Sequence, residues 1–142
     1  TLPCIGADYN DAYSEAIKQY MVENDLENSV ALLGRRTDVP QLLANASIGV
    51  LTSTSEGLPM ALLEYGAAQL AVVVTDVGYC KEVVQDFGKV TPVDALEAFV
   101  YALERYICSK EKLQQDARSF QKHIAKHYSE ATVLPQLLSY YN

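Results

Sequence analysis

The chain has 142 residues, of which 49% are apolar and 20% charged, a balance typical of one globular domain. Its formal net charge of −7 argues against a surface for nucleic acid or an anionic membrane, because no basic cluster is larger than Arg35-Arg36. No apolar run is long enough to span a membrane, and Thr1-Leu2-Pro3 does not begin a signal peptide.

Hydrophobic patterning predicts alternating strands and helices over the first two thirds of the chain. Asp8 or Asn10 is expected to cap the first helix, and Thr37 or Asp38 a short second helix. In chain order the expected elements are a strand over Leu2–Ala7, a helix ending near Asn24, a strand over Ser29–Leu33, a helix over Pro40–Asn45, a strand over Ser47–Leu51, a helix from Pro59 to Ala67, a strand over Ala71–Thr75, a helix over Cys80–Gln85 and a strand at Lys89-Val90.

The last third of the chain is expected to be helical. Asp94 is expected to cap a long helix over Ala95–Ser109, and Ser129–Tyr140 predicts a final helix interrupted or kinked at Pro135. The inner faces follow from apolar residues at helical spacing. For the first helix of the chain they are Ala12, Ala16, Ile17, Tyr20 and Met21; for the long helix they are Leu96, Phe99, Val100, Leu103 and Ile107; for the helical stretch after it they are Leu113, Ala117, Phe120 and Ile124.

This alternation predicts a Rossmann-like, doubly wound parallel α/β sheet of about five strands with C-terminal helices. In such a sheet ligands bind at the carboxyl ends of the strands. Four loops that follow strands hold much of the polar and Gly content: Gly6–Asp8, Gly34–Thr37, Thr52–Gly57 and Thr75–Tyr79. They favour a nucleotide-sized ligand, although tight βα turns would explain some of the glycines equally well.

Two carboxylates frame the helix that begins near Pro59. Glu56 lies in the loop before it and Glu64 lies within it, about 7–8 Å along the axis from Pro59. The helix start offers free N–H groups and a positive dipole end, which suit a phosphate. Both acids can therefore address one ligand that crosses the helix N-terminus. The alternative is that Glu56 only complements the dipole and Glu64 is a solvated surface residue.

The residues around these acids form a recognisable pattern, LLGRR, DVP, LLANA, S-EG-P, LLE, VVVTDVG and EVV. With them, Leu32–Val84 resembles the donor-binding half of GT-B glycosyltransferases, in particular the large retaining family 4 (glycosyltransferases group 1). The family's E-x7-E motif corresponds to Glu56 and Glu64. The resemblance implies that the whole chain is a C-terminal, nucleotide-sugar-binding domain and one half of a GT-B fold.

The resemblance also implies a role for each matching residue. Glu64 would bind the ribose hydroxyls of the donor, and Glu56 would lie at the transferred sugar as the catalytic-site acid. The other expected donor-binding positions are Ser55, Gly57, Leu58, Pro59, Met60 and Arg35, the last of these near the base. The donor would be a UDP-, GDP- or ADP-sugar, the transfer would retain the anomeric configuration, and no metal is expected.

Several features depart from the family pattern. The usual Gly-x-Pro after the motif helix is Gln69-Leu70-Ala71, and a common Gly-Gly pair is Gly78-Tyr79. The basic residues that hold the diphosphate in similar proteins lie upstream, and Lys18 is the only basic residue over Leu2–Asn24. With no initiator Met, the start is expected to be a fragment boundary. The acceptor domain, the first strand and the first helix would then be missing, and the fragment alone would be inactive.

Other interpretations remain open at this point. The chain can be a non-catalytic nucleotide- or partner-binding domain with a degenerate donor site; a receiver-like domain fits the alternation but not the Glu56/Glu64 spacing. His123 and His127 are four residues apart, as two metal ligands can be, but a solvated or tail-packing pair is favoured. An odd count of three cysteines indicates a reduced, cytoplasmic setting. A glycosyltransferase of the family that the chain resembles would work in the cytosol or at the cytosolic membrane face. Cys80 has no neighbouring His to activate it as a nucleophile.

Overall fold

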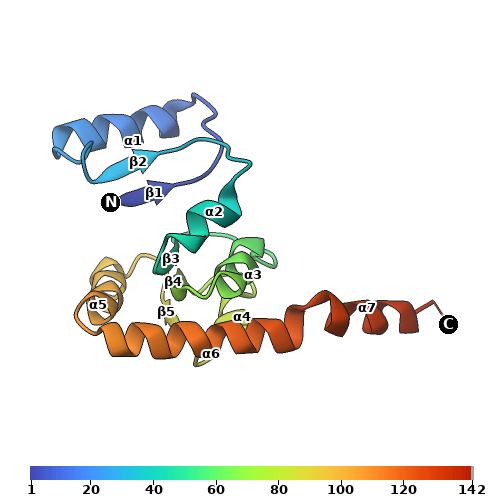
Figure 1. Cartoon of the computed structure of the whole chain (residues 1–142). Helices are drawn as coiled ribbons and strands as arrows, with labels where there is room; N and C mark the ends of the chain where they lie inside the picture. The colour runs from blue at the N-terminus through green and yellow to red at the C-terminus, as the bar shows by residue number, and fades with distance from the viewer. Residues whose placement is uncertain (142) are drawn as a thin grey trace. The chain divides into compact units, whose positions relative to one another are not determined.

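The computed structural model describes residues 1–141, and the chain divides into two compact units, one of residues 1–39 and one that begins at Pro40. The predicted alternation is confirmed (Figure 1). In chain order the elements are β1 Leu2–Cys4, α1 Ala12–Glu23, β2 Val30–Leu32, α2 Val39–Ala44, β3 Ile48–Leu51, α3 Met60–Ala67, β4 Ala71–Thr75, α4 Cys80–Val84, β5 Lys89–Thr91, α5 Leu96–Ile107, α6 Lys110–Tyr128 and α7 Glu130–Ser139.

The first unit is a parallel pair of strands joined through a helix. β1 pairs with β2 in a register that places Leu2 opposite Val30. The N-cap of α1 is Asp11, whose carboxylate accepts a hydrogen bond of 2.8 Å from the amide of Ser14. The expectation of Asp8 or Asn10 as the cap is wrong, because the Asp8 carboxylate pairs instead with the Lys18 ammonium at 2.9 Å.

The expected inner face of α1 is only partly right. Ile17 and Met21 are half-buried, whereas Ala12, Ala16 and Tyr20 are exposed. The strands of this unit are only three residues long and no residue of α1 is fully buried.

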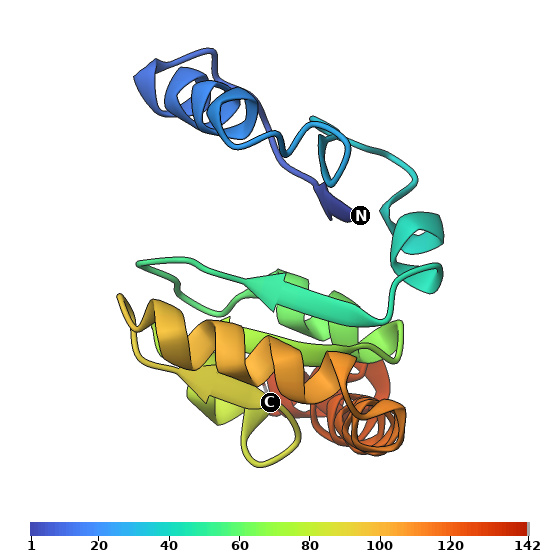
Figure 2. The ribbon, with the colours of Figure 1, turned by 90° about the vertical axis from the view of Figure 1, so that its left-hand side faces the viewer.

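The second unit is built on a three-stranded parallel sheet in the order β3-β4-β5. All five residues of the central strand β4 are buried, as expected for a strand covered on both faces. Val72 and Val74 pack against α3, α4 and α6, and Val73 packs against α5 and α6. Figure 2 shows α5 lying over one face of this sheet. The layered, doubly wound arrangement predicted for the central strands is therefore confirmed.

The five expected strands are all present, two in the first unit and three in the second. Within the units, β1 pairs with β2, and β4 pairs with both β3 and β5. Periodicity identifies strands but carries no information on which strands pair.

The expected inner face of α5 is only partly right. Phe99 is buried and Leu103 half-buried as expected, whereas Leu96, Val100 and Ile107 are exposed. Ala102 and Tyr106, which were not expected there, are buried. The helix begins after Ala95, and the expected cap Asp94 instead adopts a left-handed backbone with φ of 63°. The hydroxyl of Tyr106 donates a hydrogen bond to Asp116 on α6, so this side chain can be buried although it has a polar end.

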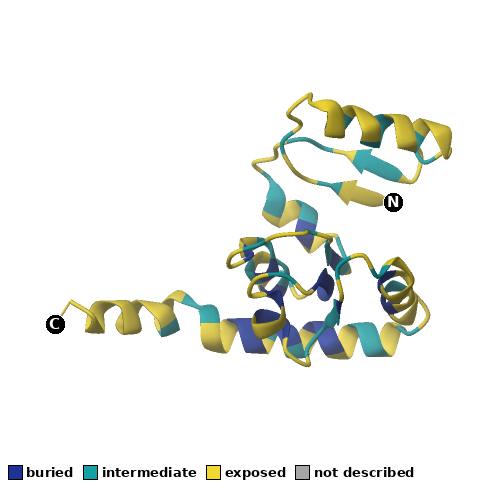
Figure 3. Ribbon diagram, turned by 180° about the vertical axis from the view of Figure 1, so that it is seen from behind, coloured by how far each residue is buried: buried dark blue, intermediate teal, exposed yellow. Residues whose placement is uncertain are grey.

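The two C-terminal helices differ sharply in burial. The predicted inner face of α6 is confirmed, with Ala117, Phe120 and Ile124 buried and Leu113 half-buried. α7 runs through Pro135 as one helix and buries no side chain (Figure 3). No helix within residues 1–141 is long and apolar enough to cross a membrane.

Candidate functional site

The loop between β3 and α3 holds one of the two acids in a fixed place. The hydroxyl of Ser53 donates a hydrogen bond of 2.6 Å to Oε1 of Glu56. The backbone of Ser53 is fixed in turn, because its carbonyl accepts a hydrogen bond of 2.6 Å from the hydroxyl of Thr75, the last residue of β4. Thr75 is only 7% exposed. The loop is therefore tied to the carboxyl end of the central strand.

The loop after β4 lies directly against this first loop. The amide of Tyr79 donates a hydrogen bond of 3.2 Å to the carbonyl of Gly57. Gly78 has φ of +51°, and a Cβ at this position would collide with the carbonyl oxygens of Glu56 and Gly57. Only glycine combines this backbone conformation with so close an approach. The ring of Tyr79 is 61% exposed beside the loop that carries Glu56.

α3 begins immediately after these loops. Pro59 is buried and is the N-cap with ψ of 101°, so it precedes the first helical residue instead of being that residue. The first amides of a helix have no partner within it, and they point away from its start together with the positive end of the dipole. Glu64 is exposed one turn beyond the exposed Met60, on the same side of α3.

The structure thus gathers most of the predicted site residues at one end of the second unit. Glu56 is half-buried at the mouth of α3, Glu64 lies along the helix, and exposed positions lie at or near the helix start: Ser55, Gly57, Leu58 and Met60. Arg35 is exposed in the loop after β2 and belongs to the first unit.

Ser53 and Thr75 are site residues that the sequence pattern did not predict. The spacing Ser-x-x-Glu was a usable signal for the Ser53–Glu56 bond, since a side chain in a tight loop reaches three residues ahead. The Thr75–Ser53 bond joins residues 22 apart, and local sequence carries no signal for it.

Two other groups considered from sequence lie outside this chemistry. Burial raises the pKa of the Cys80 thiol, and the carboxylates of Glu56 and Asp76 add to the effect, so the thiol stays neutral at ordinary pH. His123 is buried with its ring 4.8 Å from Phe87 and 4.9 Å from His127, between ring centroids, which fits a packing role. Within residues 1–141 no three His, Cys, Asp or Glu side chains are grouped to hold a metal.

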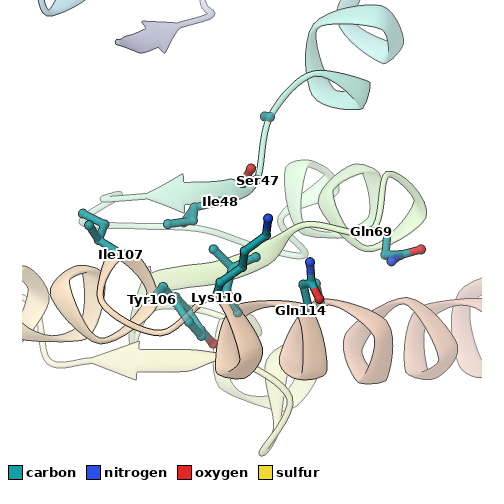
Figure 4. A pocket seen from close by; sticks show the side chains of 10 residues that line it. Ser47, Ile48, Gln69, Tyr106, Ile107, Lys110 and Gln114 are labelled. Atoms are coloured by element: carbon teal, nitrogen blue, oxygen red, sulfur yellow. The ribbon is translucent and has the colours of Figure 1, made fainter.

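A hollow of about 510 Å³ lies at the opposite end of the sheet (Figure 4). Ser47 precedes β3 and Gln69 precedes β4, so both mark the amino ends of the strands. Lys110 and Gln114 of α6 line the hollow from the other side. The predicted ligand site lies at the carboxyl ends, and the hollow is therefore not part of it.

Comparison with known proteins identifies a family. The model of the family described as "Glycosyl transferases group 1" matches residues 1–109. A 58-residue segment is 41% identical to the Campylobacter jejuni protein named N,N'-diacetylbacillosaminyl-diphospho-undecaprenol alpha-1,3-N-acetylgalactosaminyltransferase, covering 41% of this chain and 15% of that protein. An 88-residue segment is 32% identical to the Escherichia coli protein named UDP-Gal:alpha-D-GlcNAc-diphosphoundecaprenol alpha-1,3-galactosyltransferase, covering 61% of this chain and 23% of that one.

Solved structures resemble the whole chain. Anabaena HepE in complex with UDP superposes with a TM-score of 0.93 at 24% identity, over 99% of this chain and 40% of that one. The C-terminal domain of a glycosyl transferase group 1 family protein from Francisella tularensis gives a TM-score of 0.77 at 19% identity, over 87% of this chain and 66% of that one. At these identities the likeness establishes the fold.

Proposed function

The chain belongs to the glycosyl transferases group 1 family and has the α/β fold of one half of a GT-B enzyme, and from this premise we propose that it binds a nucleotide-sugar as the donor domain of a retaining glycosyltransferase. One observation carries the proposal. Glu56 lies just before the start of α3 and Glu64 lies one turn inside it, and this helix follows the carboxyl end of β3, where parallel α/β sheets bind their ligands.

The roles follow from the chemistry of a nucleotide-sugar. The N-terminal amides and dipole of α3 would bind the diphosphate, and this charge stabilisation would help it to leave. Glu64, about 6 Å along the axis from Met60, would accept hydrogen bonds from the ribose hydroxyls. Glu56 would contact the hydroxyls of the transferred sugar. The exposed residues Ser55, Gly57, Leu58 and Met60 would complete the pocket, and no metal takes part.

A UDP-sugar is the favoured donor. UDP-Gal is part of the name of the E. coli relative, and HepE was crystallised with UDP and with UDP-glucose. Both curated names specify an alpha linkage in the product. If the donor sugar is likewise α-linked to its diphosphate, formation of an α-linked product is transfer with retention.

The names of the curated relatives also indicate a class of acceptor. Both curated relatives are named for acceptors linked to undecaprenol through a diphosphate, which suggests work at the cytosolic face of a membrane. The matched segments span 15% and 23% of those proteins, and this chain spans 40% of HepE. We therefore assign acceptor binding to a separate N-terminal domain.

The alternative of a degenerate donor site depends on three departures from the family pattern, at Gln69, Ala71 and Tyr79. Gln69 and Ala71 lie at the amino end of β4, far along the strand from Thr75 and the loops that carry the acids. Of the three departures from the family pattern in this region, only Tyr79 adjoins the proposed donor site.

Calorimetric titration tests the proposal. The chain and its Glu64→Gln variant are each titrated with UDP, GDP and ADP. Both are also titrated with the derivatives of these nucleotides that carry glucose, galactose or mannose. Binding that falls at least tenfold in Glu64→Gln, but not in a Glu97→Gln control on exposed α5 surface, supports the donor site. An affinity that is unchanged in Glu64→Gln overturns the proposal. So does the absence of binding both by this chain and by the full-length protein.

A further inference from the structure

We propose that Ser53 is a positioning residue for Glu56, and that it strengthens binding of the sugar part of the donor but not of the nucleotide part. The inference rests on the proposed function, because it assigns the Glu56 carboxylate to the sugar. It concerns a residue that touches the acid and not the donor.

The Ser53–Glu56 hydrogen bond is short and directional. At 2.6 Å it has the length of a hydroxyl bound to an ionised carboxylate, which is stronger than a bond between neutral groups. It occupies Oε1, and within residues 1–141 no other described group bonds the Glu56 side chain. One carboxylate oxygen is thus fixed by the protein, and the second is left for a ligand hydroxyl.

The donor of this bond is itself anchored to the rigid part of the unit. The Thr75 hydroxyl holds the Ser53 carbonyl at 2.6 Å, and Thr75 ends the fully buried strand β4. The sequence of contacts therefore runs from the sheet through Thr75 and Ser53 to the carboxylate. A carboxylate held before the ligand arrives loses less conformational entropy on binding, which favours affinity.

The loop does not depend on the Ser53 hydroxyl for its course. Its far end is held by the Tyr79 amide bound to the Gly57 carbonyl and by the close approach of Gly78. Its near end is held through the Ser53 carbonyl, a backbone group that side-chain replacement leaves in place. Removal of the hydroxyl should therefore release the carboxylate while the loop stays folded.

The test compares dissociation constants for UDP-galactose and for UDP, or for the GDP or ADP pairs if these bind more tightly. Ser53→Ala is expected to weaken nucleotide-sugar binding by about tenfold and to change binding of the nucleoside diphosphate by less than twofold. Ser53→Thr keeps the hydroxyl and should restore the affinity. Thr54→Ala removes an exposed hydroxyl next in the chain and should change neither constant.

A double-mutant cycle makes the inference sharper. In a Glu56→Gln background, Ser53→Ala should have a much smaller effect than in the wild type, because the group that it positions has lost its charge. Thermal unfolding of each variant shows whether it is folded, and Ser53→Cys replaces Ser53→Ala if the latter unfolds.

The outcomes separate the two proposals. Four results would each overturn the positioning role and leave the donor site intact. In Ser53→Ala these are an equal loss of affinity for nucleotide-sugar and nucleotide, or no loss of affinity. The others are no recovery of affinity in Ser53→Thr, and full additivity of Ser53→Ala with Glu56→Gln. Binding that does not depend on Glu64, or no binding at all, overturns the proposed function and this inference together.

Discussion

Gly66 on α3 lies directly against the side chain of Ile124 on α6, with the position of a Cβ at residue 66 only 2.8 Å from the Ile124 Cβ. The helix that carries Glu64 is therefore seated on α6 at a point where no side chain fits between them. Because the amides that would bind a diphosphate are at the start of the same helix, this contact sets the place of the proposed site.

We expect Gly66→Ala to destabilise the protein by about 2 kcal/mol through overpacking. The sign is opposite to that at an exposed helix position, where alanine is favoured over glycine by about 1 kcal/mol. Urea unfolding measures the change. In the Gly66→Ala/Ile124→Ala double mutant part of the loss should be recovered, because Ile124→Ala removes the Cγ1 and Cγ2 atoms that meet the added methyl group. Full additivity of the two changes would contradict the contact.

Gly78→Ala should disturb the proposed site directly. The added methyl would meet the carbonyls of Glu56 and Gly57, so we expect a loss of about 1–3 kcal/mol in stability and weaker nucleotide-sugar binding. Gly34→Ala is the matched control, because Gly34 has a similar φ of +64° but nothing within 4 Å of its Cβ position. Equal effects at the two glycines would attribute the loss to φ alone.

We expect the folded protein to lose stability at alkaline pH because of Tyr106. Burial raises the pKa of Tyr106 above its usual range, and its hydrogen bond of 2.9 Å to the buried carboxylate of Asp116 adds to the effect. Above pH 10.0, the ordinary tyrosine pKa, the unfolded chain loses this proton and the folded chain keeps it, so the free energy of unfolding falls as pH rises. Urea unfolding between pH 8 and pH 11 measures the slope.

The matched variants for this prediction are on one helix. Tyr106→Phe should reduce the alkaline slope and cost about 1–2 kcal/mol at neutral pH, because Asp116 loses a hydrogen bond. Tyr101→Phe changes an exposed tyrosine of α5 and should leave both quantities unchanged. A slope that persists unaltered in Tyr106→Phe would refute the assignment.

His123 predicts a loss of stability at acidic pH. Burial lowers the pKa of His123, and the positive charges that His127 and Lys126 carry lower it further. Below pH 6.5, the ordinary histidine pKa, this side chain is protonated in the unfolded chain but still neutral in the folded chain. The free energy of unfolding therefore falls as pH falls, until the pH is below the pKa of His123 in the folded chain. Chemical unfolding at pH 7 and pH 5 measures the loss. His123→Phe should reduce it, and the exposed His127→Gln should retain most of it.

The positions of the candidate site residues in the fold could be predicted because the signals for them are local. The run Ala71–Thr75 is apolar or β-branched throughout and forms the buried central strand, and Glu56, Pro59 and Glu64 lie within nine residues of one another. Their places follow from one loop and one helix start, which short-range rules describe well.

The errors arose where long-range contacts decide. Apolar spacing in α5 predicts Leu96, Val100 and Ile107 on the buried face, but Tyr106 is buried instead, with Asp116 on the next helix accepting a hydrogen bond from its hydroxyl. Asp8 was expected to cap α1, yet the Lys18 side chain ten residues away holds its carboxylate. In each case the competing partner is distant in sequence, and a pattern within one element does not contain it.

The close approach at Gly78 has a consequence for enzyme engineering. A mutant library intended to change the sugar specificity of the proposed donor site should leave position 78 untouched, since every side chain there collides with the neighbouring loop. Position 79 is the productive choice: its backbone is pinned to Gly57, while its side chain faces solvent and can be exchanged without moving that backbone.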